Sequence, residues 1–487
     1  MTLIFNVSIA EKDASTRDCR LIHCEPAGKP VLFIDGLNKP EANKRKQIRK
    51  YVMLGKNRGK TRKPQPVSPD ESHTGLVHSD LVVEMHYPAV PNKVGDELSF
   101  TRFAAPVAPQ LMRDILKFSL MAKKVMYPLE PCIEFHRKDR IDTFYFELMT
   151  YDATYLHAVA FSCQAFFNRA SSRETAELTR RSVFHHSAAL KQLRERLSNQ
   201  GEQIKFSDST ILVILSLAMQ AHLTDDFDTA KQHMEGLRRI VDMRGGLGAF
   251  GYNSKLTMEM LKCDLGIALF NGSEPFFFRD PSLEPMIPYE LGSFTVQPSD
   301  IHQSESWTPA QWNLNADLIR AWTVMERFCS TINSAINRNR RLQKEILLNT
   351  MASVMYRLLD MKDFDPNSLN EAICLGLLAF TSHTFLQFQN MKPPQAEFPR
   401  KYRDCLQTIE CSATTASAML WLLTIGAIAV FTPTDDSWLK PLLRDQMRHC
   451  RFSGWDDLEN HLTKFLWIKL LHDGPGERVF NTVALEP

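Results

Sequence analysis

The sequence contains no Cys-x-x-Cys pair, although ten cysteines are spread along its 487 residues. Zinc ribbons and thiol-redox sites are built from such pairs, so neither kind of site is expected. Cys19, His23 and Cys24 would need a distant fourth ligand to hold a metal, and an unpaired polar coil is the preferred interpretation of this group. We therefore predict no metal and no cofactor, and we expect the reduced thiols of a cytosolic or nuclear protein.

Long apolar runs are equally scarce. The N-terminus lacks the basic segment and the apolar stretch of a signal peptide, so none is expected. The most apolar stretch, Ala416 to Phe431, is shorter than the roughly 20 residues that a membrane-spanning helix needs. We interpret it as a helix buried in a protein core and expect no membrane insertion. A small-molecule pocket lined by Trp421 to Phe431 is the less favoured alternative.

The alternation of apolar and polar residues that marks β-strands is rare beyond about residue 105. Apolar residues instead recur at helical spacing over most of the remaining chain. The segments predicted to be helical include 141–167, 172–198, 207–221, 225–244, 252–270, 310–337, 340–361, 368–391, 401–431, 441–449 and 455–471. The predicted fold class is therefore all-α: a large array of roughly a dozen helices with a basic, largely extended N-terminal arm.

Acidic residues are absent from the segment Lys44–Lys63, which contains ten basic ones. Residues 1–75 carry 15 basic and 8 acidic residues, whereas the rest of the chain has a net charge of −5. A basic arm on a mildly acidic body suggests contact with an anionic partner. We interpret the segment as a nuclear localisation signal, with a nucleic-acid contact or a solvated tail as the alternatives. The predicted site comprises Lys44, Arg45, Lys46, Arg49, Lys50, Lys56, Arg58, Lys60, Arg62 and Lys63.

Prolines and charge together suggest the domain organisation. Five prolines between residues 64 and 105 predict a linker or an extended segment. We predict a partly disordered basic arm over residues 1–75 and a linker over 76–105. An all-helical domain over 106–475 and a C-terminal tail over 476–487 complete the chain.

The segment His233–Gly251 ends in Gly246-x-Gly248-x-x-Gly251, which matches the outline of a dinucleotide-binding fingerprint. That fingerprint functions only between a strand and a helix, whereas the residues before these glycines have the spacing of an amphipathic helix. We interpret the glycines as the stop and turn of that helix, because glycine tolerates the left-handed conformation there. No cofactor is predicted at this segment.

No group of residues predicts catalysis. His233 has no nearby nucleophile with an orienting acid, so it is not predicted to be a catalytic base. His185 and His186 are adjacent on a helix and are poorly placed to share one metal. The charged face of the His233 helix could bind an anion near the glycines, but a solvated face with one structural ion pair is preferred. Its residues are Arg238, Arg239, Asp242 and Arg244.

Several motifs occur in a characteristic order. They are Asp152-x-x-x-Leu156-His157-Ala158, His186-x-x-Ala189-Leu190-x-x-Leu193, Ser207–Ala221, His233-x-x-Gly236-Leu237-x-x-Ile240-Val241-x-x-Arg244-Gly245-Gly246-Leu247, Asp264, Trp421-x-Leu423-x-x-Gly426, Trp438 and Trp455-x-x-Leu458-x-x-x-Leu462-x-x-Phe465-Leu466-Trp467. In this order they resemble the all-helical regulatory domain of fungal zinc-cluster transcription factors, over about residues 105–475. The marker helix and turn of this resemblance consist of His233, Gly236, Leu237, Arg244, Gly245 and Gly246.

Members of that family usually carry a binuclear zinc cluster, built from six cysteines, before this region, and the sequence has none. Instead, Phe33-Ile34 and Ile48–Lys60 resemble the basic N-terminal motif of fungal relatives that lack the cluster. The resemblance implies a nuclear, non-enzymatic, transcription-regulator-like protein whose helical domain binds other proteins, in a homo- or hetero-oligomer, or an effector. Direct DNA binding stays open. An interaction scaffold that retains the fold without binding DNA and an enzyme on a helical scaffold are the alternatives.

Overall fold

The computed structural model describes residues 102–134, 143–170, 176–199, 201–250, 254–278, 312–361, 364–386, 396–409, 415–452 and 454–484. The chain divides into two compact units, residues 1–92 and 93–487, and every described residue lies in the second. The basic arm with its ten predicted site residues lies outside the described residues, as does the group Cys19, His23 and Cys24. The division into arm, linker, helical domain and tail therefore stays a prediction.

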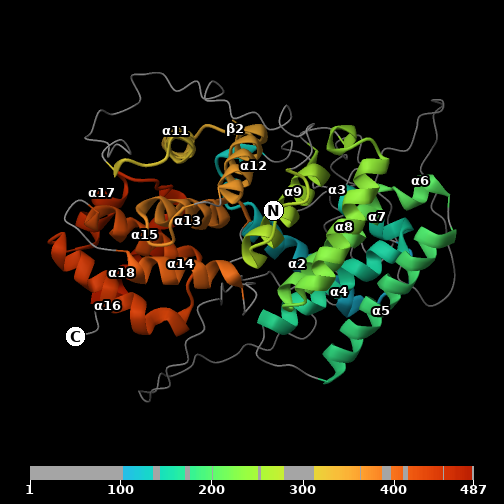
Figure 1. Cartoon of the computed structure of the whole chain (residues 1–487). Coiled ribbons are helices and arrows are strands. Elements are labelled where there is room, and N and C mark those ends of the chain that lie inside the picture. The colour runs from blue at the N-terminus through green and yellow to red at the C-terminus, as the bar shows by residue number, and fades with distance from the viewer. Residues whose placement is uncertain are drawn as a thin grey trace, which may run out of the picture. The chain divides into compact units, whose positions relative to one another are not determined.

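The described residues form sixteen α-helices, which confirms the predicted all-α class (Figure 1). The N-terminal helices are α2 (Pro109–Met126), α3 (Thr143–Tyr151), α4 (Ala153–Ala170), α5 (Ala176–Asn199), α6 (Glu202–Lys205), α7 (Asp208–Leu223), α8 (Phe227–Met243) and α9 (Lys255–Asn271). The C-terminal helices are α11 (Ala316–Asn337), α12 (Lys344–Asp360), α13 (Leu369–Thr381), α14 (Glu397–Thr408), α15 (Ala416–Ala429), α16 (Asp436–His449), α17 (Trp455–Leu462) and α18 (Lys469–Ala484).

Helix α9 connects the two groups of helices. It packs against α7 and α8 on one side and against α12 and α14 on the other. Most of its residues are buried, so it lacks a solvated face of the usual width. A short parallel ladder links the groups a second time, because β1 (Ile133–Glu134) pairs with β2 (Leu342–Gln343). The described helices therefore share one hydrophobic core.

Short polar residues fix the starts and ends of the helices around the glycine-rich segment. Ser207 caps α7 by accepting the amide of Thr210, and Asp226 caps α8 by accepting the amide of Thr229. Gly272 ends α9 in the left-handed conformation, with φ of 64°. These boundaries lie within three residues of those of the predicted segments 207–221, 225–244 and 252–270, so local chemistry sets them.

Three segments predicted as continuous each contain two helices. Segment 141–167 divides into α3 and α4, because Asp152 interrupts the first helix and its carboxylate accepts the amide of Tyr155, 3.0 Å away. Segment 401–431 divides into α14 and α15. Segment 455–471 divides into α17 and α18, and the buried turn between them is closed by His472, whose Nδ1 accepts the amide of Ile468 at 2.9 Å.

Helix α18 extends past residue 475, where the sequence predicts a tail. The tail would begin at Asp473-Gly474-Pro475-Gly476, a sequence of a kind that usually ends a helix. The helix nevertheless runs through this sequence to Ala484. A Cβ on Gly476 would come within 2.7 Å of Trp455 and 3.0 Å of Trp467, so the glycine lets the helix approach two tryptophan rings. Close packing outweighs local propensity here.

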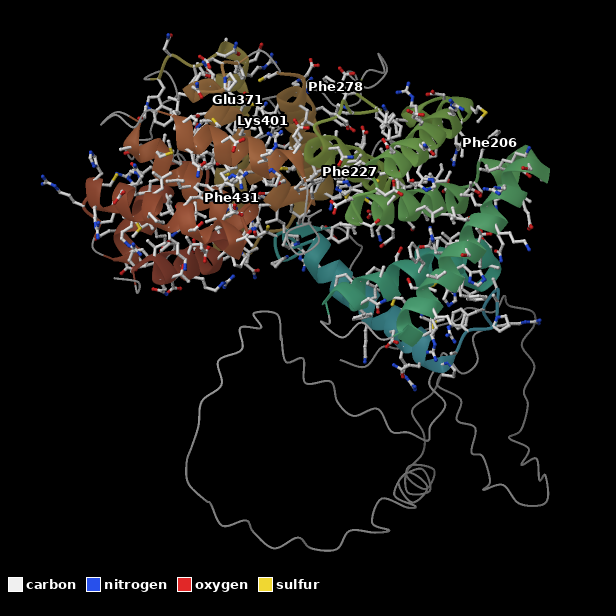
Figure 2. All side chains as sticks on the ribbon, turned by 60° about the horizontal axis from the view of Figure 1, so that its bottom comes forward. Phe206, Phe227, Phe278, Glu371, Lys401 and Phe431 are labelled. Atoms are coloured by element: carbon white, nitrogen blue, oxygen red, sulfur yellow. The ribbon has the colours of Figure 1, made fainter. Side chains whose placement is uncertain are left out.

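The two most apolar stretches lie inside the protein. Helix α15 is buried along almost its whole length, as predicted for Ala416 to Phe431. Among the described residues, Leu369–Leu386 is long and apolar enough to cross a membrane, but 89% of it is buried within the protein. This stretch comprises α13 and the π-helical segment η6 (Ser382–Leu386). Its buried Glu371 forms an ion pair with Lys401 of α14, which fits a core helix (Figure 2).

Candidate functional site

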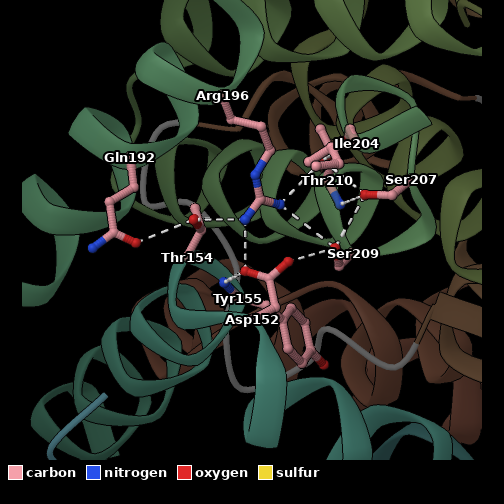
Figure 3. Close-up of polar contacts among 9 residues, drawn as sticks. All are labelled: Asp152, Thr154, Tyr155, Gln192, Arg196, Ile204, Ser207, Ser209 and Thr210. Atoms are coloured by element: carbon pink, nitrogen blue, oxygen red, sulfur yellow. Dashed lines mark hydrogen bonds and ion pairs between the residues drawn. The ribbon is translucent and has the colours of Figure 1, made fainter. Parts of the chain in front are cut away.

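A buried ion pair joins three of the N-terminal helices. The carboxylate of Asp152, between α3 and α4, lies 2.7 Å from the Nη2 atom of Arg196 in α5. Its other oxygen accepts a 2.6 Å hydrogen bond from the hydroxyl of Ser209, in the first turn of α7 (Figure 3). The side chains of Asp152 and Arg196 are each only 9% exposed. Removing one member of such a pair leaves an uncompensated buried charge.

Arg196 uses its remaining donors within the same group. Its Nη2 donates to Thr154 at 2.7 Å and its Nη1 donates to Thr210 at 3.1 Å (Figure 3). Burial alone would raise the pKa of Asp152, but the hydrogen bonds from Arg196, Ser209 and the backbone hold the pKa of that carboxyl below its ordinary value. The carboxylate therefore stays ionised at neutral pH. We call Asp152, Thr154, Arg196, Ser209 and Thr210 the α7-start network.

A second ion pair fastens the end of α8 to the start of α7. The Nη1 atom of Arg244 lies 2.6 Å from the carboxylate of Asp208 and donates to the carbonyl of Phe206 at 3.0 Å. The guanidinium carbon of Arg244 also lies 3.8 Å from the centre of the Phe250 ring. Asp208 is in the first turn of α7, where an acidic side chain is favoured. The C-terminal end of the family-marker segment is thus fixed to the start of α7.

The two glycines after Arg244 form the turn that ends α8. Gly245 and Gly246 have φ of 96° and 83°, a region that glycine adopts without strain. The amide of Gly246 donates to the carbonyl of Val241, and the amide of Gly245 donates to that of Asp242, both at 2.9 Å. This pair of bonds is the Schellman arrangement of a helix C-terminus. The glycines follow a helix rather than a strand, so the mechanism of a dinucleotide fingerprint does not apply.

The other predicted marker residues occupy different environments along α8. Leu237 is fully buried, whereas Gly236 is half-buried and a Cβ placed on it would meet nothing within 4 Å. His233 is half-buried, and burial, together with the nearby charge of His186, lowers its pKa. The structure therefore brings Arg244, Gly245 and Gly246 together at the turn, whereas the rest lie about two to three turns earlier in α8.

Two of the three cations that could bind an anion near the glycines, Arg238 and Arg244, already have partners. Arg238 lies 2.8 Å from the carboxylate of Asp242, and its Nη1 donates to the carbonyl of Phe276 at 2.6 Å. Arg244 pairs with Asp208. The preferred interpretation of this face predicted one structural ion pair, and the structure contains two. The Asp208 pair could not be predicted locally, because its members are 36 residues apart.

Asp264 forms a buried node on α9. Its carboxylate accepts the amides of Phe276 and Phe277, at 2.8 Å and 3.1 Å, and the hydroxyl of Tyr356 at 2.9 Å. Burial raises the pKa of this carboxyl to about 6, although these three donors act in the opposite direction. The sequence motifs include Asp264, but not the partner Tyr356 on α12. The node fixes α12 to α9 and thus joins the N-terminal and C-terminal helices.

A pair of histidines lies between α4 and α5. The Nδ1 atoms of His157 and His185 are 2.8 Å apart, and one ring must be a neutral acceptor. Burial, and then the charge of His157, lower the pKa of His185 to about 4. His186 instead stacks on Phe161, with ring centres 4.4 Å apart. No group of three or more His, Cys, Asp or Glu side chains in the described ranges is arranged to hold a metal ion.

The thiols in the described residues are poor nucleophiles. Six of these seven free cysteines are buried. Burial raises the pKa of Cys132 to about 11 and that of Cys163 to about 12. A thiol reacts as its thiolate, which is scarce at neutral pH for such groups. The site described above therefore consists of charged and hydroxyl groups that fasten helices together, and it contains no reactive thiol.

Sequence motifs identified Asp152 and the Ser207–Ala221 segment, but not Arg196 or Thr154. One signal could have revealed Arg196. The buried positions of α5 recur at helical spacing, and Arg196 falls on this inward stripe, where a charged side chain needs a partner. The stripe consists of Ser182, His185, Ala189, Leu193 and Arg196.

Comparison with known proteins gives a family match to the N-terminal helices, and neither a curated protein nor a solved structure matches the chain. The family described as the fungal specific transcription factor domain matches residues 125–263, which is narrower than the resemblance predicted over 105–475. The match includes the α7-start network and the turn at Gly245-Gly246, and it ends one residue before Asp264. Residues 125–263 of the chain are therefore similar to the fungal specific transcription factor domain family.

Proposed function

We propose that this protein is a nuclear, non-enzymatic regulator of transcription whose helical domain binds a partner protein or an effector. The observation that carries the proposal is the match of residues 125–263 to the fungal specific transcription factor domain. That family is in general non-enzymatic and acts in transcription, so the match supports a transcription-regulator-like role. Nuclear location and the mode of binding are the finer parts of the proposal.

The segment Lys44–Lys63 is proposed to direct nuclear import. Ten basic residues without an intervening acid suit an import receptor that recognises positive charge. The test fuses residues 40–66 to a fluorescent reporter that is too large to enter nuclei by diffusion. The reporter should accumulate in nuclei, and a matched fusion with all ten basic residues changed to Gln should stay in the cytoplasm. Equal distribution of the two fusions would contradict the import role.

The regulatory role is tested by mapping the genomic positions of the intact protein. Enriched promoters, whose transcripts change when the protein is depleted, are the expected result. A set of positions no different from that of an unfused nuclear reporter would contradict the role.

An interaction scaffold without direct DNA contact is the second candidate. It is favoured by the resemblance of Phe33-Ile34 and Ile48–Lys60 to the basic N-terminal motif of fungal relatives that lack the zinc cluster. Promoter enrichment that survives replacement of all ten basic residues, in a protein brought to nuclei by an added import signal, would support recruitment through protein contacts. Loss of enrichment in that variant would support direct contact with DNA.

A further inference from the structure

One side of α5 faces solvent along about five turns. The buried side chains of the helix lie on the opposite side, where they contact α4 and α7. The solvent-facing residues recur at spacings of three and four, so they form a single stripe. This outer α5 face consists of Arg180, Phe184, Ser187, Lys191, Arg194 and Ser198, and it is bordered by Val183 and Leu197. Helix α5 lies at the edge of the N-terminal helices (Figure 1).

Large apolar side chains are unusually exposed on this face. Phe184 is 62% exposed, Val183 is 57% exposed and Leu197 is 38% exposed. These are three of the seven exposed large hydrophobic residues in the described part of the chain. The ring of Phe184 contacts His157 edge-on, with ring centres 5.9 Å apart. The ring therefore lies against His157 and leaves most of its surface uncovered.

The same face carries unpaired positive charge. Arg180, Lys191 and Arg194 are exposed, and none of them forms an ion pair with another described residue. Glu195 is the single acidic residue between Arg180 and Ser198. In contrast, the cations of α8 considered above, Arg238 and Arg244, are paired with carboxylates. The outer α5 face therefore offers apolar anchors and cations that no described carboxylate neutralises.

We propose that the outer α5 face binds an acidic amphipathic helix of a partner protein. Arg180 and Ser198 are separated by about 27 Å along the helix axis, the length of a partner helix of about 18 residues. Apolar side chains of the partner would pack on Val183, Phe184 and Leu197, and its carboxylates would pair with Lys191 and Arg194. Ser187, between these groups, is small enough to let a second helix approach closely. Recognition by apolar anchors at helical spacing is a common mode of helix binding.

A protein helix suits the face better than nucleic acid or a membrane does. Nucleic acid would use the cations but leave Phe184 and Val183 without a partner, because backbone binding depends on charge. A membrane-binding helix inserts a broad apolar side, whereas the apolar side of α5 is buried against α4. Only an acidic and apolar partner uses both kinds of residue.

The inference deepens the proposed function by naming where the helical domain binds a partner and the chemistry of that partner. Its test uses purified full-length protein and is independent of nuclear import and promoter mapping, so either can fail alone. The probe is a fluorescent 18-residue helical peptide with Leu and Phe on one side and Glu on the flanks. Binding is followed by fluorescence anisotropy. A second peptide has every Glu replaced by Lys.

The acidic peptide should bind at least tenfold more tightly than the basic one. Phe184→Ala should weaken its binding at least tenfold, because central aromatic residues dominate such interfaces. The double variant Lys191→Glu with Arg194→Glu should also bind the acidic peptide at least tenfold more weakly. Raised salt should weaken binding of the acidic peptide to the wild-type protein. The matched control is Arg340→Glu with Lys464→Glu, which makes the same charge change at exposed positions outside α5 and should leave binding unchanged.

Four results would overturn the proposal. The first is equal binding of the two peptides, and the second is unchanged binding in a Phe184→Ala variant that has wild-type circular dichroism. The third is tighter binding of DNA or anionic vesicles than of the acidic peptide. The fourth is self-association of the chain that Phe184→Ala abolishes. The last would show that a second copy of the chain occupies the face.

Discussion

The N-terminal and C-terminal helices differ in the polar and aromatic contacts at their centres. The N-terminal helices converge on the buried pair of Asp152 and Arg196 and on the pair of Asp208 and Arg244. The C-terminal helices converge on buried indole rings instead. Trp322 and Trp421 lie 5.1 Å apart between ring centres, and the indole of Trp421 donates to the carbonyl of Leu466 at 3.0 Å.

This contrast follows the boundary of the family match. The matched residues 125–263 contain both charged fastenings and no tryptophan, since all seven tryptophans lie after residue 306. Charged pairs with fixed geometry specify how helices align, whereas apolar packing stabilises without much directional demand. The two groups should therefore respond differently to loss of charge, to loss of an aromatic ring and to pH.

The largest effect is expected when Arg196 is changed to Ala. The variant leaves the carboxylate of Asp152 buried without its cation, which should cost about 3–5 kcal/mol of unfolding free energy. Amide hydrogen exchange should show the loss first in α4, α5 and α7. Arg194→Ala, at an exposed position on the same helix, is the matched control and should be nearly neutral. Similar exchange in the two variants would contradict the role given to the α7-start network.

A smaller effect is expected when Trp421 is changed to Phe. An aromatic ring remains in the core, but the carbonyl of Leu466 loses its donor, at a cost of about 1–3 kcal/mol. Far-ultraviolet circular dichroism during denaturant unfolding measures this loss. Exchange should increase in the C-terminal helices and change little in α4 and α5. An equal increase in amide exchange in the N-terminal and C-terminal helices would mean that α9 couples them into one cooperative unit. That result would contradict the difference proposed between the two groups.

The pH dependence of stability provides a third comparison. The pKa of His185 falls from the ordinary value of 6.5 in the unfolded chain to about 4 in the folded one. The unfolded state therefore binds more protons between these values, so this contribution to stability is full above pH 6.5 and is lost as pH falls towards 4. In His185→Gln, unfolding free energy should fall less steeply over this range. Parallel curves for the variant and the wild type would contradict the assignment.

The burial of Asp264 has the opposite effect from that of His185 on the pH dependence of stability. Its folded pKa of about 6 lies above the ordinary value of 3.8, so its contribution to stability decreases as pH rises between these values. Comparing Asp264→Asn with His185→Gln across the same titration separates the two contributions. Only Asp264→Asn should make stability fall more steeply on acidification than it does in the wild type.

The smallest effect is a gain in stability from Gly236→Ala. This glycine is in the middle of α8 and a Cβ there would meet nothing within 4 Å. Alanine should therefore raise the unfolding free energy by about 0.5–1 kcal/mol through its helix propensity alone. Thermal unfolding monitored by circular dichroism detects this change. A loss of stability would show that the position tolerates no side chain, although the surrounding space is open.

Short-range chemistry made part of the fold predictable. Ser207 before α7, Asp226 before α8 and Gly272 after α9 act within four residues of the backbone groups that they satisfy. The same holds for the turn at Gly245-Gly246. Such signals need no knowledge of the rest of the chain, and the structure places the helix boundaries where they predict them.

Long-range partners were not predictable. Asp152 and Arg196 are separated by 44 residues, and Asp264 and Tyr356 by 92, so no local spacing connects them. The length of helix α18 was not predictable either, because the local sequence near residue 475 is typical of a helix end although the helix continues to Ala484. Gly474-Pro475-Gly476 is typical of a helix end, but the close approach of Gly476 to Trp455 and Trp467 favours a helix. The function of the ten basic residues between 44 and 63 stays a prediction.

The short ladder between β1 and β2 has a consequence for the synthesis of the chain. Ile133 pairs with Leu342, so the first strand leaves the ribosome more than two hundred residues before its partner. At about 5–20 residues per second, roughly 10–40 seconds pass between the synthesis of β1 and that of β2, with which it pairs. During that interval, the edge of Ile133-Glu134 is open to other chains. Chaperone contact with a nascent chain of this protein should therefore end only after Gln343 has emerged.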